Sequence, residues 1–239
     1  PTAPEGANLF MADLKNANLK YALLDKVSMQ KANLSEADLS YASLKHANLL
    51  GADFSYANLH GTIINNTTLM DTKVRLHWEI INKGAKERTL NGVDLSYATF
   101  DGVNFQSSNL SNSNLQQSKL RNSNLRNVDL TDSNLSYCDF GNADLRGAKL
   151  TGAQMVWVNL RGARIDKNTI LDEKWRLVWE IVNKGARGRD LSEKDLSEAD
   201  LEFSLLERAN MRGTNLKDST LGWARLEEAD LTNAILTRT

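Results

Sequence analysis

Residues that could do chemistry are few in this sequence and lie far apart. The three histidines, His46, His60 and His77, share no spacing typical of a metal site. Cys138 is the single cysteine, so an internal disulfide is excluded, and we expect its thiol to be buried and unreactive. The sequence contains no glycine-rich phosphate loop and no grouping of serine or cysteine with histidine. It therefore predicts no enzyme activity and no metal, cofactor or small-molecule site.

The overall charge is close to neutral, with 29 basic and 30 acidic residues and a formal net charge of −1. Such a balance creates no field that would direct the protein to nucleic acid or to anionic lipid. No apolar run reaches the roughly 18 residues that suggest a membrane span. We therefore expect a soluble protein whose partner is another protein, either cytoplasmic or exported after removal of an N-terminal signal.

A period of five residues dominates the chain. A large apolar residue recurs at every fifth position from Leu9 to Leu69, from Leu90 to Ile170 and from Leu191 to Leu236, usually with a small residue two places before it. Helices repeat at about 3.6 residues and strands at 2, so neither element explains this period. The small and large residues of one pentad face the same side of an extended segment, but the next small residue would face the opposite side. The chain must therefore turn a corner in every pentad, which winds a solenoid around these two positions.

Half of the aromatic residues stand two places after a large apolar residue, and their spacing gives the length of one coil. Tyr21 and Tyr41 are 20 residues apart, which predicts four sides per coil. When the extra length of the interruption after Leu69 is removed, one column collects Tyr21, Tyr41, Tyr97, Tyr137 and Trp157, but not Tyr56. About ten coils spaced by about 4.8 Å predict one rod on the order of 48 Å long.

The pentads resemble a known family. Residues 32–36 (ANLSE), 52–56 (ADFSY) and 143–147 (ADLRG) are similar to the repeats of pentapeptide-repeat proteins. The resemblance implies an all-β solenoid, a right-handed quadrilateral β-helix of about ten four-sided coils, interrupted by two short α-helical insertions. The interrupting segments look most like those of cyanobacterial members of the family.

We divide the chain, residues 1–239, as a single solenoid with two insertions. Its parts are an N-terminal tail 1–6, a first repeat block 7–70, a first insertion 71–89, a second repeat block 90–171, a second insertion 172–190 and a third repeat block 191–239. No covering helix stands at either end of the repeats. We therefore expect the rod to stack end to end as a homodimer, or to be capped by residues outside this sequence.

The two insertions are one element used twice, because residues 71–85 and 172–186 have similar sequences. Their apolar residues share one helix face, which contains Val74, Trp78 and Ile81 in the first insertion and Trp175, Trp179 and Val182 in the second. Asp71 and Asp172 are expected as N-caps, and Gly84 and Gly185 as left-handed helix stops. We expect a short helix in each insertion.

Two interpretations of these helices remain open. Each apolar face either packs on the rod or forms a docking surface for a partner, and the aromatic column has the same two interpretations. The candidate protein-binding residues are Trp78, Ile81, Trp175, Trp179, Tyr21, Tyr41, Tyr97, Tyr137 and Trp157.

The functional hypothesis that follows is a non-catalytic scaffold or adaptor that binds another protein. The resemblance implies one alternative, since some pentapeptide-repeat proteins mimic duplex DNA and bind DNA gyrase. Such mimics are strongly acidic, and the near-neutral charge of this chain disfavours that role. A second alternative is a purely structural protein without a specific binding role.

Overall fold

The computed structural model describes residues 6–239, so residues 1–5 of the expected tail lie outside it. Two helices are present, α1 (Thr72–Lys83) and α2 (Glu173–Lys184), one in each expected insertion. The rest of the described chain forms coils that are joined by isolated parallel bridges, without named strands. Bridged residues are 20 apart, for example Asn8 with Ser28, and a bridge occurs at every fifth residue. Each coil therefore has four sides, as the aromatic spacing predicts.

A tight turn at each corner explains the period of five. The N–H of Ala12 donates to the carbonyl of Leu9 at 3.1 Å, and the same bond recurs in the following pentads. The third residue of this turn has a positive φ, 54° at Met11, and the equivalent residue has a positive φ at almost every corner. Turns of type II have this geometry, which side chains other than glycine adopt at a cost. Each corner ends one side of the coil and begins the next.

The interior contains the two recurring positions. Leu34, Leu39 and Leu44 are among the fully buried side chains of the first repeat block. Where serine takes the small position, its hydroxyl finds a backbone partner, as Ser113 does by donating to the carbonyl of Leu90 at 2.8 Å. Cys138 is equally buried, and burial raises the pKa of its thiol to about 12, so this thiol is unreactive as predicted.

The register predicted from the sequence is wrong by one residue at the end of the first and second repeat blocks. Leu69 and Ile170 were expected inside, but they are 49% and 51% exposed and form the bridges to Asn48 and Lys149, 21 residues earlier. One additional residue in the preceding turn shifts the register in each case. As a result, the buried small position is taken by Thr68 and Thr169.

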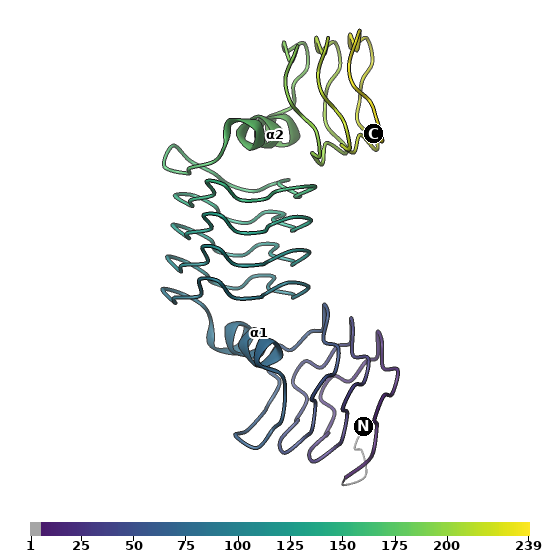
Figure 1. Cartoon of the computed structure of the whole chain (residues 1–239), viewed down its shortest axis with the longest axis vertical. Coiled ribbons are helices and arrows are strands. Elements are labelled where there is room, and N and C mark those ends of the chain that lie inside the picture. Colours follow the sequence, from purple (N-terminus) through teal and green to yellow (C-terminus); the bar gives the residue numbers. More distant parts are fainter. Residues whose placement is uncertain (1–5) are drawn as a thin grey trace.

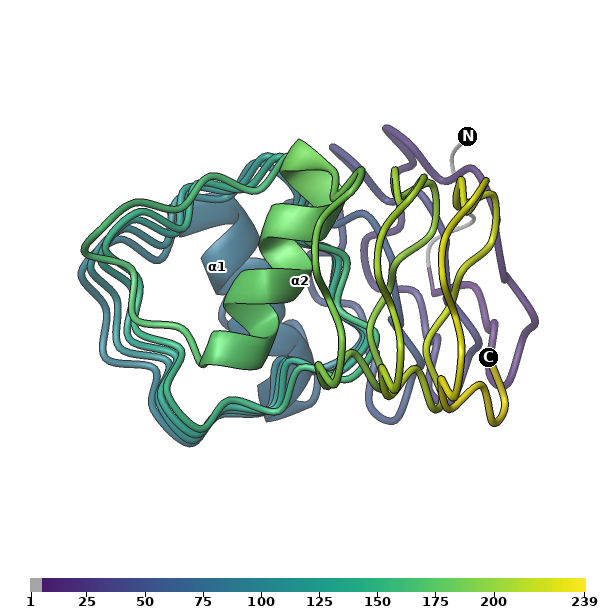
Figure 2. The same cartoon turned by 90° about the horizontal axis from the view of Figure 1, so that it is seen from above.

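The coils form three stacks, which we name the first arm (residues 6–70), the spine (residues 85–171) and the second arm (residues 186–239). Figure 1 shows that each arm lies across the direction of the spine, and Figure 2 shows that both arms extend from the same side of it. The molecule is therefore a flat bracket and not the single straight rod that we predicted. At each corner of the bracket a helix replaces most of the pairing between coils.

Candidate functional site

The buried faces of the helices hold the corners of the bracket together. α1 buries Val74, His77 and Ile80, and α2 buries Trp175, Val178 and Ile181. Both helices therefore pack on the coils with their apolar faces, which is the structural interpretation of the two that the sequence left open.

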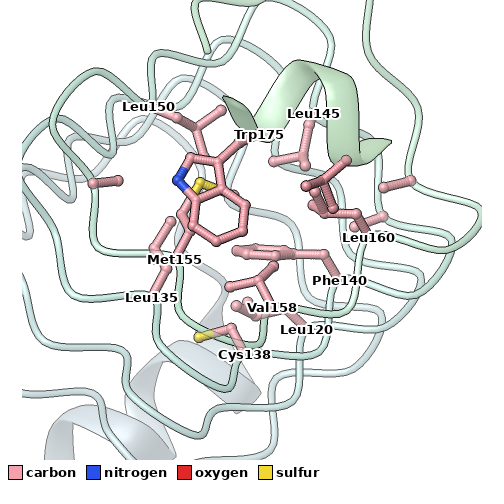
Figure 3. Packing of buried hydrophobic residues seen from close by; sticks show 14 of the residues in the cluster. Leu120, Leu135, Cys138, Phe140, Leu145, Leu150, Met155, Val158, Leu160 and Trp175 are labelled. Carbon is pink, nitrogen blue, oxygen red and sulfur yellow. The ribbon is translucent and has the colours of Figure 1, made fainter. Parts of the chain in front are cut away.

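Trp175, expected as a contact for a partner, is instead part of the core. Its side chain is 7% exposed, because the first turn of α2 directs it into the open end of the spine. Figure 3 shows the indole among Leu150, Met155, Phe140 and other core residues. A side chain in this position fills the end of the stack and is not accessible to a partner.

Trp78 and Trp179 are only partly buried, but their polar atoms already have partners within the chain. The indole Nε1 of Trp78 donates to the carbonyl of Thr62 at 2.8 Å. Trp179 makes the same bond to Ala163 at 2.6 Å in the second corner. These bonds attach both helices to the coils beneath them, so the two indoles stabilise the corners.

An asparagine makes the same set of three hydrogen bonds at each corner. Asn82 Nδ2 donates to the carbonyls of Leu59 and Trp78 at 3.0 and 2.9 Å, and Oδ1 accepts from the N–H of Gly61 at 2.7 Å. Asn183 makes three equivalent bonds of the same lengths in the second corner. The sequence analysis missed this residue, although its repetition in both insertions was visible. The helix is thus attached in the same way at both corners.

The helix ends differ in detail from the expectation. Asp71 and Asp172 occupy the N-cap positions, but neither side chain makes a capping bond. Asp71 accepts instead from the N–H of Gly51 at 3.1 Å, in the coil below. Gly84 has φ 80° and ψ 172°, so its φ is positive but the residue is not in the left-handed helical region. At the first corner, the side chain of the N-cap residue therefore binds the neighbouring coil and not the N-terminus of its own helix.

The predicted aromatic column divides into two. Tyr21 stacks on Tyr41, with ring centroids 5.2 Å apart. Tyr97 lies instead beside Tyr56, whose N–H donates to the Tyr97 carbonyl at 2.7 Å, although the prediction left Tyr56 out of the column. The single column was wrong because the chain turns at α1, whereas the prediction assumed a straight rod.

The two corners define an inner face of the bracket. We name as the inner face the sides of the coils that meet at the corners, which are residues 17–20, 37–40, 57–60, 98–101, 118–121, 138–141, 158–161, 199–202 and 219–222. The first edge of this face contains Tyr56, Tyr97, Gln117, Tyr137, Trp157, Glu198 and Asp218. The second edge contains Tyr21, Tyr41, Gly61, Gly102, Asn122, Asn142, Gly162, Phe203 and Trp223. The inner face of both arms and of the spine surrounds one hollow.

Hydrogen bonds at the second end of the spine support this assignment, as the bond from the N–H of Tyr56 to the carbonyl of Tyr97 does at the first end. Trp157 donates its backbone N–H to the carbonyl of Glu198 at 2.8 Å, and its indole to the carbonyl of Asp218. Arg161 binds the carboxylate of Asp200 through two bonds of 2.6 and 3.1 Å. Its guanidinium also lies over the ring of Phe203, 5.4 Å from the centroid. The same side of the spine thus joins both arms.

The first corner is more open than the second. His60 stands there in the place of Arg161, and beside it is a pocket of about 550 Å³. Ile81, another residue predicted to contact a partner, lines this pocket from α1 together with Gly102. No arginine closes this corner as Arg161 closes the other. The pocket borders the hollow, because His60 lies on the inner face and Gly102 on its second edge.

The width of the hollow follows from the spacing of the coils. Tyr56 lies one spacing from Tyr97, Tyr97 three coils from Trp157, and Trp157 one spacing from Glu198. Five spacings of about 4.8 Å place the facing backbones of the arms on the order of 24 Å apart. One layer of secondary structure packs about 10 Å from each of its neighbours. The hollow therefore has room for one helix or one sheet.

His77 gives the first corner a dependence on pH. Its imidazole is 6% exposed and Nε2 has no hydrogen-bond partner among residues 6–239. Burial, together with the charge of Lys73, lowers its pKa from 6.5 to about 4. Protonation therefore favours the unfolded chain, so the stability present above pH 6.5 is lost as the pH falls towards 4.

Val178 occupies the position of His77 in α2, which suggests the substitution His77→Val. Between pH 6.5 and 4 we expect the wild-type protein to lose about 3 kcal/mol more stability than this variant. Urea denaturation at a series of pH values measures the difference. Parallel pH profiles of the two proteins would contradict the account of this corner.

Among the described residues, no group of three or more His, Cys, Asp or Glu side chains could hold a metal ion. The three histidines lie apart, with His46 hydrogen-bonded to Thr67 at 2.6 Å, His60 against Tyr41 and His77 in the core. Neither of the two helices in this part of the chain has the length and apolar character to cross a membrane.

Comparison with known families agrees with the repeats. A model of pentapeptide repeats matches in eight copies, over residues 7–40, 32–70 and 195–238. A model of a pentapeptide repeat region matches residues 86–170. These matches cover most of the chain, which belongs to the pentapeptide-repeat family. Proteins of this family are right-handed quadrilateral β-helices and are generally not enzymes.

Similar solved structures include three cyanobacterial pentapeptide-repeat proteins. HetL of Nostoc sp. strain PCC 7120, involved in heterocyst differentiation regulation, is 26% identical over 99% of this chain and 91% of its own, with a TM-score of 0.26. The protein alr5209 of the same strain is 34% identical over 43% and 84%, with a TM-score of 0.34. Rfr23 of Cyanothece 51142 is 24% identical over 70% and 90%, with a TM-score of 0.27. No curated protein matches the chain in sequence.

Proposed function

We propose that this chain is a right-handed quadrilateral β-helix that acts as a non-catalytic scaffold and binds another protein in the hollow between its arms. The observation that carries the proposal is the bracket itself, whose two corners are built by the same contacts. Asn82 and Asn183 make equal sets of bonds, and Trp78 and Trp179 brace the helices in the same way. Two fixed corners hold the arms at a constant separation, as a scaffold for one partner requires.

The inner face offers the groups that a protein partner would contact. Tyr137 is 41% exposed on the first edge, and Lys119 is exposed beside it on the spine, with Nζ 4.9 Å from the ring centroid of Tyr56. Exposed tyrosines of this kind are enriched in protein interfaces. The helices have fewer groups available for a partner, because their buried apolar residues and the indole nitrogens of Trp78 and Trp179 already contact the coils.

A site-specific cross-link distinguishes the hollow from the helices. Since Cys138 is buried and its thiol has a raised pKa, a cysteine introduced at the surface becomes the single reactive thiol. Lys119→Cys places a photoreactive label in the hollow, and Lys184→Cys places it on the exposed side of α2. In an extract of the source organism, we expect the label at position 119 to capture a protein that the label at position 184 does not capture.

Capture from position 184 alone would instead assign binding to the helices, and capture from neither position would favour a purely structural role. The net charge of −1 disfavours the DNA-mimic alternative, because such mimics are strongly acidic. A gyrase supercoiling assay that is unaffected by a large excess of the protein is the expected result.

A further inference from the structure

Exposed apolar side chains gather at one edge of both arms. They lie on the second edge of the inner face and on the coil side that follows it, and they are Tyr21, Leu23, Tyr41 and Ile63 in the first arm and Phe203, Leu205 and Trp223 in the second. We name these two groups the arm patches. The spine carries only Gly102, Asn122, Asn142 and Gly162 at this edge. The bracket thus has an apolar patch on each arm and a polar stretch between them.

Both arm patches lie on the same flat face of the bracket. This face consists of the coil sides that follow the second edge, residues 22–25, 42–45, 62–66, 103–106, 123–126, 143–146, 163–167, 204–207 and 224–227. At each corner the stack of coils changes direction by a rotation. The axis of this rotation is parallel to the inner face and perpendicular to the flat face. The flat faces of the arms and the spine therefore stay in one plane, and Figure 1 views the bracket perpendicular to that plane.

The folding of a single chain does not explain why large apolar residues occupy exposed positions in the second arm. Trp223 is 82% exposed and Phe203 is 59% exposed, so neither gains much from burial. Both have a positive φ, 59° and 58°, where glycine would be unstrained. Large apolar residues that are exposed together typically mark a surface that another molecule covers.

We infer that a second copy of this chain covers the flat face. A half-turn about an axis through the middle of the spine and parallel to the arms exchanges the two arms. It places Ile63 against Leu205 of the second copy, since both lie in the coil nearest the spine. It also places Tyr41 against Trp223 of the second copy, one coil further out. Each contact occurs twice, as in any two-fold interface.

The charges beside the arm patches are complementary in the same arrangement. The half-turn places Lys45 opposite Glu227 of the second copy, and both side chains are exposed. Lys45 has no ion-pair partner among residues 6–239. Glu227 has only a contact of 3.7 Å with Arg225, in which both side chains are more than half exposed. A second copy would thus pair a lysine that the single chain leaves unpaired.

This association differs from the end-to-end stacking that the sequence predicted, because it uses the flat face and not the terminal coils. It covers only the second edge of the inner face, so the hollow of each copy remains open to a different partner. The inference therefore does not depend on the proposed function, and either can fail without the other.

Sedimentation equilibrium of the full chain tests the inference. We expect the wild-type protein to have twice the chain mass of 26.6 kDa at micromolar concentration. Trp223→Gly removes the largest apolar contact and should raise the dissociation constant about 100-fold. The variant should fold, because glycine suits the φ of 59°. Asn112→Gly, at φ 57° on the opposite side of the spine, is the matched control and should leave the mass unchanged.

A charge exchange tests the arrangement itself. Lys45→Glu and Glu227→Lys should each weaken the dimer by about tenfold, because two attractive pairs become repulsive. An equimolar mixture of these two variants should recover the dimer, since each interface then contains one original and one reversed pair. A monomeric wild-type protein, a dimer that Trp223→Gly does not weaken, or a mixture that stays dissociated would overturn the inference.

Discussion

Replacing Trp175 with alanine should lower the free energy of unfolding by about 3–5 kcal/mol, the largest effect that we expect from one substitution. The indole is 7% exposed and fills the end of the spine core, so its removal leaves a cavity between α2 and the last coils (Figure 3). Guanidinium denaturation followed by circular dichroism measures the loss. Hydrogen exchange should also increase in residues 145–164, where the cavity opens.

Trp223 provides a matched control, because it is 82% exposed. In dilute solution, where the chain is a monomer, Trp223→Ala should change the unfolding free energy by no more than about 0.5 kcal/mol. If the two tryptophan variants were equally stable, Trp175 would not be part of the core and the role of α2 at the corner would be wrong.

The second large effect should come from the corner asparagines. Asn82→Ala removes two donors and one acceptor. It leaves the N–H of Gly61 without a partner and the carbonyl of Leu59 with the N–H of Thr62 alone. We expect a loss of about 2–4 kcal/mol at this corner, and a similar loss for Asn183→Ala at the other. The loss should appear as faster hydrogen exchange of the coils beside each helix.

An outward asparagine of an ordinary pentad is the control for this effect. Asn109 accepts one bond, from the N–H of Ser111 at 2.9 Å, so Asn109→Ala should cost about 1 kcal/mol or less. An equal cost for all three asparagine variants would mean that the corners have no special role. Different costs at the two corners would contradict the conclusion that the helix is attached in the same way at both.

Much of the local structure was predictable from the sequence because it depends on short spacings. The period of five requires a turn in every pentad, and Tyr21 and Tyr41 give the 20 residues of one coil. The helices were also predictable, since residues 71–85 and 172–186 repeat one apolar pattern and both elements are present there.

The register shift at Leu69 and Ile170 was hidden by the sequence pattern. Both residues are apolar and continue the period of five, so the additional residue in the turn before them could not be seen from spacing alone. The one available signal was the threonine before each, since Thr68 and Thr169 are small enough for the interior position that they occupy.

The bend of the bracket could not be predicted because it depends on contacts between distant segments. An insertion between two pentads is compatible with a straight stack from which the helix projects, and also with a corner. The corner forms because Asn82 and Trp78 bind the carbonyls of Leu59 and Thr62. The spacing of residues along the sequence does not predict these contacts. For the same reason the arm patches were missed. The sequence shows that Phe203 and Trp223 are 20 residues apart, but not that the bend brings them to the edge that also contains Tyr21 and Tyr41.

The distance between the two arms tests the bracket most directly. Spin labels on Lys20→Cys and Gly222→Cys lie on the inner face of opposite arms, and Cys138 is buried enough to stay unlabelled. In the bracket, the labelled backbones are on the order of 25 Å apart, whereas a straight rod would separate them by roughly 41 Å. Pulsed electron paramagnetic resonance should give one narrow distribution near the shorter distance. A distribution centred near the longer distance would contradict the bracket, and with it the proposal of a partner held between the arms.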